Sequence, residues 1–298
     1  MTEDHPTAPP AEPGQHRPAA ASDEQTHNWN GDDGRRWVRH RERYERMQRH
    51  FTPHLLRAAA VGEADRVLDI GCGAGAVSRT VARNASRGHV LGVDVSEPLL
   101  AEARRLAREE AVENVAFEEG DAQTYPFPDG AFDLVISRNG VMFFSDPSTA
   151  FANIAGAVRP GGRLVFTCWQ QAAANEWLVT LRTAVAPYVR LPDMDAPGKP
   201  GAYSLADPER VRKLLTGAGF TDIALEPVTE PMPLGDDPDD AVAFMGGLGM
   251  LRDHFERTTE ESARQALAAL RTAYTRHQGA DGVALGASAW VVTARAPG

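Results

Sequence analysis

The nine-residue segment VLDIGCGAG, from Val67 to Gly75, constrains the fold more than any other stretch of the chain. An apolar strand runs straight into glycines at every second position, and a helical stretch follows. Glycine tolerates a positive φ and, because it has no Cβ, leaves room for a ligand beside the backbone. Such turns lie at the carboxyl edge of parallel sheets, where these folds bind ligands. The segment therefore predicts a ligand site at a strand–turn–helix junction.

Short apolar strands alternate with helical stretches through residues 61–168. Apolar runs that are continuous indicate strands buried on both faces, and alternation with helices favours a parallel sheet with right-handed crossovers. The pattern therefore predicts an α/β fold. We expect strands at 66–70, 89–93, 115–118, 132–137 and 163–168, and helices at 76–84, 97–110 and 147–158, the last with Asp146 as its N-cap.

The two ends of the chain differ from this regular centre. Residues 1–34 are rich in Pro, Ala, Asp and Glu, so we expect a disordered tail in which only Trp29 could dock. A cap segment follows at 35–60, whose helix at 35–51 carries an apolar stripe and an Arg/Glu face that we expect to be solvated. The main domain spans 61–298, with further strands at 220–227 and 287–294. Stretches at 169–203 and 228–285 exceed ordinary loop length and are expected to be substrate-cap insertions.

Charge and composition narrow the class of protein. The chain has 31 Lys and Arg against 41 Asp and Glu, a net charge of −10, which disfavours general nucleic-acid binding. Two cysteines exclude a disulfide framework and a four-cysteine zinc site. His50 and His54 have a metal-ligand spacing, but Pro53 interrupts the helix and no acid lies between them as in HExxH, so we expect no metal. No apolar run reaches the ~18 residues of a membrane span, and the first residues lack a basic, apolar leader pattern. We therefore expect a cytoplasmic protein whose partner is a small molecule.

An acid follows or ends each of three successive strands, beside the glycine turn: Asp69, Asp94 and Asp121. The turn has the spacing GxGxG, whereas a dinucleotide fingerprint has GxGxxG, and no P-loop is present. An acid beside the turn disfavours a pyrophosphate and suits an amino group. Asp94 can accept the hydroxyls of a ribose, and Asp121 can accept a hydrogen bond from an exocyclic amine. Together they indicate a site for an amino acid, a ribose and an adenine.

With these motifs in place, the chain resembles the class I S-adenosylmethionine-dependent methyltransferases, in the branch of the ubiquinone and menaquinone methyltransferases. The resemblance covers about residues 35–168 and implies a doubly wound, seven-stranded, mostly parallel sheet whose last strand is antiparallel. It also implies S-adenosylmethionine as donor and S-adenosylhomocysteine as product. The residues that carry it are VLDIGCGAG (67–75), LGVDVSEPLL (91–100), EGDAQTYPFPDGAFDLVISRNGVMFF (119–144) and RPGGRLVF (159–166).

The resemblance also assigns roles to residues of the cofactor site. The acid and the glycine turn hold the methionine moiety, the acid of the second strand holds the ribose, and the following residue packs on the adenine. The third acid and its neighbour bind the adenine edge, while the end of the fourth strand lies near the sulfonium. The residues so assigned are Asp69, Gly71, Cys72, Gly73, Gly75, Asp94, Val95, Asp121, Ala122, Arg138 and Asn139.

The segment Met142-Phe143-Phe144 stands where many relatives carry a histidine, so it offers no evident proton acceptor. Weak catalytic candidates elsewhere are Asn139, His54 and His254. Packing alone would explain the aromatic and thioether side chains near the expected pocket, yet they also suit a wall for an apolar substrate. The substrate candidates are Trp37, Tyr44, Met142, Phe143 and Trp169.

The resemblance implies methyl transfer to an O, C or N atom, and with these side chains we expect a small, apolar or aromatic metabolite as acceptor, with O or C favoured. Two alternatives stay open. A protein of the same fold can bind S-adenosylmethionine yet act as a decarboxylase or cyclase, because the cofactor motifs would be the same. A nicotinamide-dependent dehydrogenase is disfavoured by the GxGxG spacing and by Asp69. The sequence predicts neither the acceptor nor the oligomeric state.

Overall fold

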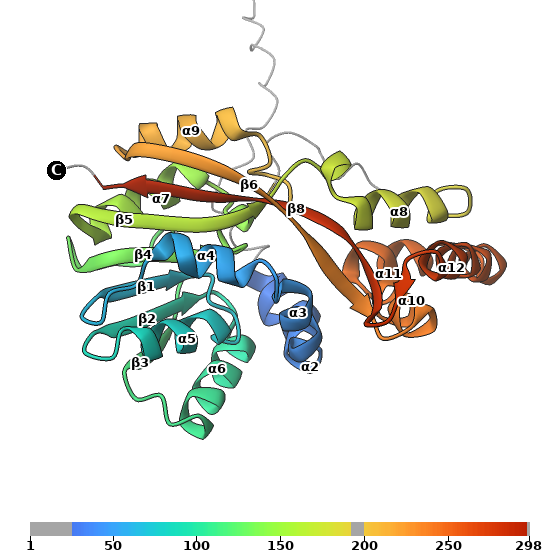
Figure 1. The fold of residues 1–298 in the computed structure, drawn as a ribbon, viewed down its shortest axis with the longest axis horizontal. Helices are drawn as coiled ribbons and strands as arrows, with labels where there is room; N and C mark the ends of the chain where they lie inside the picture. Colours follow the sequence, from blue (N-terminus) through green and yellow to red (C-terminus); the bar gives the residue numbers. More distant parts are fainter. Residues whose placement is uncertain (1–25, 192–199, 297–298) are drawn as a thin grey trace, which may run out of the picture.

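The computed structural model describes residues 26–191 and 200–296, which form one twisted sheet with helices on both faces (Figure 1). The strand order is β3-β2-β1-β4-β5-β8-β6, and the two-residue β7 (Gln278–Gly279) pairs with β8. The first five strands are parallel, whereas β8 is antiparallel to both β5 and β6. This confirms the predicted sheet. The strands are β1 (Arg66–Ile70), β2 (His89–Asp94), β3 (Val115–Glu119), β4 (Phe132–Arg138), β5 (Val158–Trp169), β6 (Thr221–Gly235) and β8 (Gly282–Arg295).

Successive side chains of the central strands are buried on opposite faces of the sheet, as the apolar runs predict. On one face, Leu134 and Ile136 of β4 pack with α4 (Thr52–Ala59) and α5 (Ala76–Asn84). On the other, Val135 belongs to the cluster that contains Phe151 of α7 (Pro147–Ala157). Because side chains alternate along a strand, a strand with helices on both faces must be apolar throughout.

The helices of the main domain begin close to where the sequence places them. Asp146 caps α7 by accepting a hydrogen bond from the Thr149 amide, as predicted, and Asp207 caps α9 (Pro208–Gly217) in the same way. Helix α6 (Glu97–Glu109) covers β3 and β2. Across the ranges 26–191 and 200–296, no helix is both long and apolar enough to cross a membrane.

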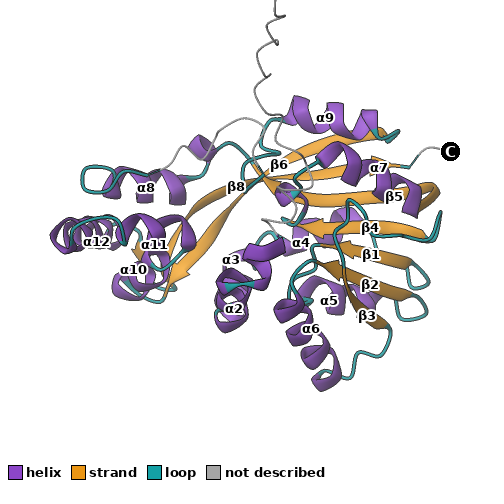
Figure 2. Ribbon diagram, turned by 180° about the vertical axis from the view of Figure 1, so that it is seen from behind, coloured by secondary structure: helices purple, strands orange, loops and turns teal. Residues whose placement is uncertain are grey.

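Strands β6 and β8 run well beyond the other strands and carry a group of helices at one end of the molecule (Figures 1 and 2). These helices are α10 (Pro238–Gly246), α11 (Gly249–Phe255) and α12 (Glu260–Thr275), and α12 packs against α10 and α8 (Glu176–Val185). The sequence predicts an insertion at 228–285, but its first and last parts belong to the two strands. Buried side chains at Met232, Leu234, Val283 and Leu285 hold this extension together.

The cap segment also differs from its prediction of one helix at 35–51. Two helices, α2 (Asp32–Arg39) and α3 (Arg41–Gln48), are separated at His40, whose backbone is not helical. Pro53 lies in the first turn of α4, where proline is tolerated, and so begins a helix rather than ending one. Residues 26–30 are helical as well, so helical structure begins before residue 35, where the sequence predicts that the tail ends. The rest of the predicted tail, 1–25, lies outside the described residues.

Leu134→Ala tests the two-faced core. Leu134 is fully buried between β4 and the helices α4 and α5, so its truncation leaves a cavity. We expect the free energy of unfolding, measured by urea denaturation, to fall by about 2–5 kcal/mol. Val179→Ala on the exposed face of α8 is the control and should change it by no more than about 0.5 kcal/mol. Equal effects at the two positions would contradict this packing.

Candidate functional site

A cavity of 510 Å³ lies at the carboxyl ends of β1, β2, β4 and β5, beneath α2 and α3. This volume is within the roughly 300–1,000 Å³ range of small-molecule sites. One end is bordered by the glycine turn and two acids, Asp94 and Asp121. The other end is bordered by aromatic and thioether side chains, with Trp177 of α8 and Leu248 completing it. The cavity is therefore polar at the sheet edge and apolar toward the helices carried by β6 and β8.

The glycine turn follows β1 with positive φ angles at Gly71, Gly73 and Gly75. A Cβ at Gly71 would lie 2.8 Å from the Gly140 Cα, so this glycine lets the ends of β1 and β4 approach each other. A Cβ at Gly73 would meet nothing within 4 Å. Gly71 and Gly73 both border the cavity, and the open side of Gly73 leaves space there for a ligand to contact the backbone.

Two members of the turn lie away from the main cavity. A Cβ at Gly75 would lie 2.6 Å from the Phe117 ring, so this glycine allows α5 to pack on β3, and it lines neither this cavity nor its smaller neighbour. Cys72 borders only the smaller cavity, of 70 Å³. Burial raises the pKa of its thiol, which leaves it protonated and a poor nucleophile.

Asp94 is held by the backbone at the end of β2. Its carboxylate accepts hydrogen bonds from the Gly73 amide at 2.8 Å and from the Ser96 amide at 2.9 Å. Burial raises the pKa of Asp94, while these backbone N–H groups oppose that rise. A carboxylate offers about four lone-pair sites, so it retains the capacity to accept two hydroxyl donors.

Asp69 is almost completely buried behind the glycine turn, where its carboxylate accepts a hydrogen bond from the Ser78 hydroxyl at 2.5 Å. Burial raises the pKa of Asp69 to about 7, against the lowering effects of Ser78 and Arg138. It borders the smaller cavity together with Arg41, Glu45 and Arg138. A cation placed there would restore the charged form of this acid.

Asp121 lines the main cavity and is fixed by Gln123. Its two carboxylate oxygens accept hydrogen bonds from the Gln123 amide at 2.9 Å and from the Gln123 side chain at 2.7 Å. The Gln123 oxygen in turn accepts from the Ser145 hydroxyl and the Asp146 amide. Gln123 borders the cavity and was not among the predicted residues, although its position two residues after the third acid could have suggested it. Ala122 and Val95 also line this part.

The segment before α2 docks on the loop that follows β2, which explains its order. Asn30 donates to the Val95 carbonyl at 2.7 Å and accepts from the Glu97 amide at 3.0 Å. The Ser96 hydroxyl donates to the Trp29 carbonyl at 2.7 Å. The Trp29 ring meets the rings of Trp37 and Phe143 edge-on. This segment therefore covers the same loop that holds Asp94.

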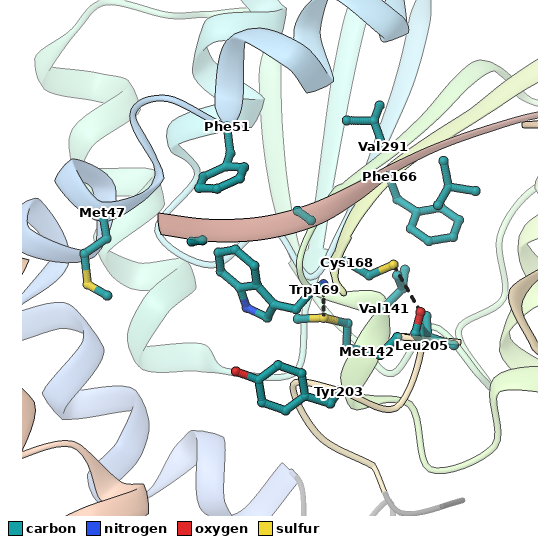
Figure 3. Packing of buried hydrophobic residues seen from close by; sticks show 14 of the residues in the cluster. Met47, Phe51, Val141, Met142, Phe166, Cys168, Trp169, Tyr203, Leu205 and Val291 are labelled. Carbon is teal, nitrogen blue, oxygen red and sulfur yellow. Dashed lines mark hydrogen bonds between the residues drawn. The ribbon is translucent and has the colours of Figure 1, made fainter. Parts of the chain in front are cut away.

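The predicted substrate residues all line the cavity: Trp37, Tyr44, Met142, Phe143 and Trp169. Trp37 and Tyr44 also border the smaller cavity beside the glycine turn. Trp37 stacks on Tyr44 with ring centroids 3.7 Å apart. Figure 3 shows Trp169, Met142 and Tyr203 close together, with the Trp169 amide donating to the Met142 sulfur at 3.3 Å. Tyr203 was not among the predicted site residues, since it comes from a segment whose sequence fixes no position relative to the sheet.

Among the catalytic candidates, Asn139 alone lines the cavity. Its backbone has φ 60°, and its side chain accepts from the Thr167 hydroxyl at 3.0 Å. His54 lies outside, where its Nε2 contacts the Glu230 carboxylate at 2.7 Å, and His254 of α11 also lies outside. Neither histidine therefore borders the cavity in this structure. No histidine, cysteine or lysine borders the cavity among the residues that the structure describes.

Arg138 ends β4 at the junction of the two cavities and ties the cap to the sheet. It pairs with Glu45 of α3 and donates to the Thr52 hydroxyl of α4 at 2.9 Å. Across the same described ranges, no three His, Cys, Asp or Glu side chains are grouped as a metal site would need. The polar groups present fit a ligand that offers an ammonium, two hydroxyls and an amine.

Comparison with known proteins identifies the family to which the chain belongs. Residues 67–162 match the family model described as a methyltransferase domain. The chain is 39% identical over 121 residues to aklanonic acid methyltransferase DauC of Streptomyces sp. (strain C5), covering 39% of this chain and 55% of that protein. It is 31% identical over 164 residues to demethylmenaquinone methyltransferase of Thermus thermophilus, covering 52% of this chain and 74% of that protein.

The match to the Streptomyces protein thus spans little more than half of that relative's length. Among solved structures, YcgJ of Bacillus subtilis superposes with a TM-score of 0.57 at 20% identity, over 84% of this chain and 99% of that one. This likeness shows the shared fold. With the family model and the Thermus relative, the chain belongs to the class I S-adenosylmethionine-dependent methyltransferases.

Proposed function

We propose that the protein transfers a methyl group from S-adenosylmethionine to a small, apolar or aromatic molecule. The observation that carries this proposal is the single cavity that joins a polar end, built from strand-end acids and the glycine turn, to an apolar end. Donor and acceptor can therefore occupy one space, with the end of β4 between them. The two named relatives, which act on aklanonic acid and demethylmenaquinone by their names, support a small-molecule acceptor.

Each part of the polar end has a role in holding the donor. We assign Asp69 and the turn at Gly71 and Gly73 to the amino-acid portion, and Asp94 to the ribose hydroxyls. Val95 packs on the adenine, while Asp121 and the Ala122 amide bind its edge. Arg138 and Asn139 then lie beside the sulfur. Gly75, which packs on Phe117, acts only by shaping the turn.

When bound, the donor supplies a sulfonium methyl group that is already electrophilic. The protein's contribution is then chiefly to hold the acceptor in line with the methyl group and to exclude water. The stacked pair Trp37–Tyr44 and the Met142–Trp169 contact form rigid walls for this purpose. Because the cavity offers no histidine in its described lining, we favour acceptors whose O or C atom is already nucleophilic.

The direct test of methyl transfer is the ratio of S-adenosylhomocysteine to methylated product. Purified protein is incubated with S-adenosylmethionine and a panel of phenols, enols and carboxylic acids, and S-adenosylhomocysteine is measured together with the methylated product. Equal amounts of the two establish methyl transfer. Consumption of a substrate without S-adenosylhomocysteine would instead support the decarboxylase or cyclase alternative.

Asp94→Ala tests the ribose assignment. It removes charge-assisted hydrogen bonds of about 1.5–3 kcal/mol each, so the affinity for S-adenosylhomocysteine should fall by about tenfold or more in calorimetry. Asp133→Ala, at the opposite edge of the sheet, is the control and should leave this affinity unchanged. An unchanged affinity in Asp94→Ala would remove this residue from the site.

The raised pKa of Asp69 predicts a pH dependence of donor binding. The charged carboxylate favours the ammonium, whereas the protonated form, populated below its pKa of about 7, does not. The affinity for S-adenosylhomocysteine should therefore rise between about pH 5.5 and about pH 7.5, and Asp69→Asn should flatten this rise. 5′-Methylthioadenosine, which lacks the amino acid, should show a smaller dependence. The same dependence in Asp69→Asn would assign it to another group.

The docked N-terminal segment predicts a closing cap. Asn30 bridges the Val95 carbonyl and the Glu97 amide, next to the ribose acid, so a bound donor should slow amide exchange in α2 and α3. Asn30→Ala should reduce this protection and weaken S-adenosylhomocysteine binding about threefold to tenfold. The exposed Asn28→Ala is the matched control. Exchange that is the same with and without ligand would leave these helices as fixed structure.

A further inference from the structure

Arg36 is an arginine of α2 whose side chain borders the apolar part of the main cavity. Its Nε is buried and has no hydrogen-bond partner, and it makes no ion pair with any carboxylate of the described residues. Asp33, one turn earlier on the same helix, also lines the cavity but is not paired with it. A partly buried cation without a counter-charge costs free energy, which an anion in the cavity would offset.

Two contacts fix where the guanidinium lies. A Cβ at Gly247 would stand 2.3 Å from its Nη2, so the absence of a side chain after α10 makes room for it. Burial raises the pKa of Tyr44 and the Arg36 guanidinium opposes that rise, so the two side chains lie near each other. The group therefore lies between the stacked aromatic wall and the helices carried by β6 and β8, at the apolar end of the cavity.

The other arginines near the cavity are already paired and lie at the opposite end. Arg138 pairs with Glu45, and Arg41 pairs with Glu102. Both border the smaller cavity beside the glycine turn, which Arg36 does not reach. An amino-acid carboxylate of the donor thus has two arginines close to the turn, whereas Arg36 faces the space left for the acceptor.

We propose that Arg36 binds an anionic oxygen of the methyl acceptor, so that the acceptor is an apolar or aromatic acid, with a carboxylate or enolate. This inference rests on the proposed function, since it requires that the apolar end receives the acceptor. Tyr44 lies near the guanidinium on one side, and the buried Nε–H of Arg36 supplies a donor that has no partner in the described structure. A charge-assisted hydrogen bond from this group is stronger than one from a neutral donor.

Arg36 could instead serve only to stabilise the end of α10, and this alternative has different consequences for a substitution. Helix α10 ends at Gly246, and a cation near the last carbonyls of a helix stabilises it. Substitution would then lower the melting temperature and leave ligand preference unchanged. Ligand charge preference is therefore the readout that separates the two roles.

The test compares 2-naphthoate with 2-naphthamide, two probes with the same rings but different charge. Binding of each to the full chain, saturated with S-adenosylhomocysteine, is measured by calorimetry. We expect naphthoate to bind at least about tenfold more tightly than naphthamide. Arg36→Gln should abolish this preference and Arg36→Lys should retain part of it. Arg35→Gln, which removes an exposed neighbour paired with Asp32, should keep the full preference.

Three outcomes would overturn the proposal. One is the absence of a naphthoate preference in the unaltered protein, including failure of both probes to bind. Another is a preference that persists in Arg36→Gln. The third is a fall in S-adenosylhomocysteine affinity in Arg36→Gln, which would assign the arginine to the donor's own carboxylate. Failure of the unaltered protein to bind S-adenosylhomocysteine at all would instead contradict the proposed function, and it is measured before either probe is added.

Discussion

The hydrogen bonds between the glycine turn and the end of β2 determine the geometry of the whole site. The Gly71 amide donates to the Val93 carbonyl, and the Gly73 amide donates to the Asp94 carboxylate. These bonds form only because the turn adopts positive φ at its glycines, which other residues rarely do. They place the open side of Gly73 beside Asp94, so one local conformation sets both the shape of the polar end and the position of its central acid.

The apolar end depends instead on the length of β6 and β8. Their extension beyond the sheet carries α10, α11 and α12 to the side of α2 and α3, and the cavity lies between these groups and the strand ends (Figure 1). Met232 of the extended β6 lines the cavity and is fully buried. The extension of β6 therefore supports the helices and also forms part of the cavity wall. The register of the antiparallel pair β6 and β8 thus affects the size of the space for the acceptor.

The sequence predicted the parts of this structure that short-range patterns determine. The strand–turn–helix at Val67–Gly75 lies where expected, as do Asp94 at the end of β2 and Asp121 just after β3, because apolar runs and glycine spacing fix local geometry. The unpredicted part of β6 contains prolines at 231 and 233, and proline is tolerated in an edge strand but is not typical of strands. Tyr203 reaches the cavity through tertiary packing alone, which periodicity does not encode. Arg36 was taken for part of a solvated face because its surroundings come from residues near 247.

The charges around the cavity are consistent with a reaction that consumes charge. Acids cluster at the end assigned to a cationic donor, and burial holds one of them, Asp69, at a pKa of about 7 until a cation arrives. The opposite end holds Arg36, without a described counter-charge, at the place assigned to an anionic acceptor. Methyl transfer from a sulfonium to an oxyanion or enolate removes both charges, so a poorly solvated cavity favours the transition state over the separated ions. With a neutral acceptor the positive charge would move from the sulfur to the acceptor, next to Arg36, and the arrangement would then oppose the reaction.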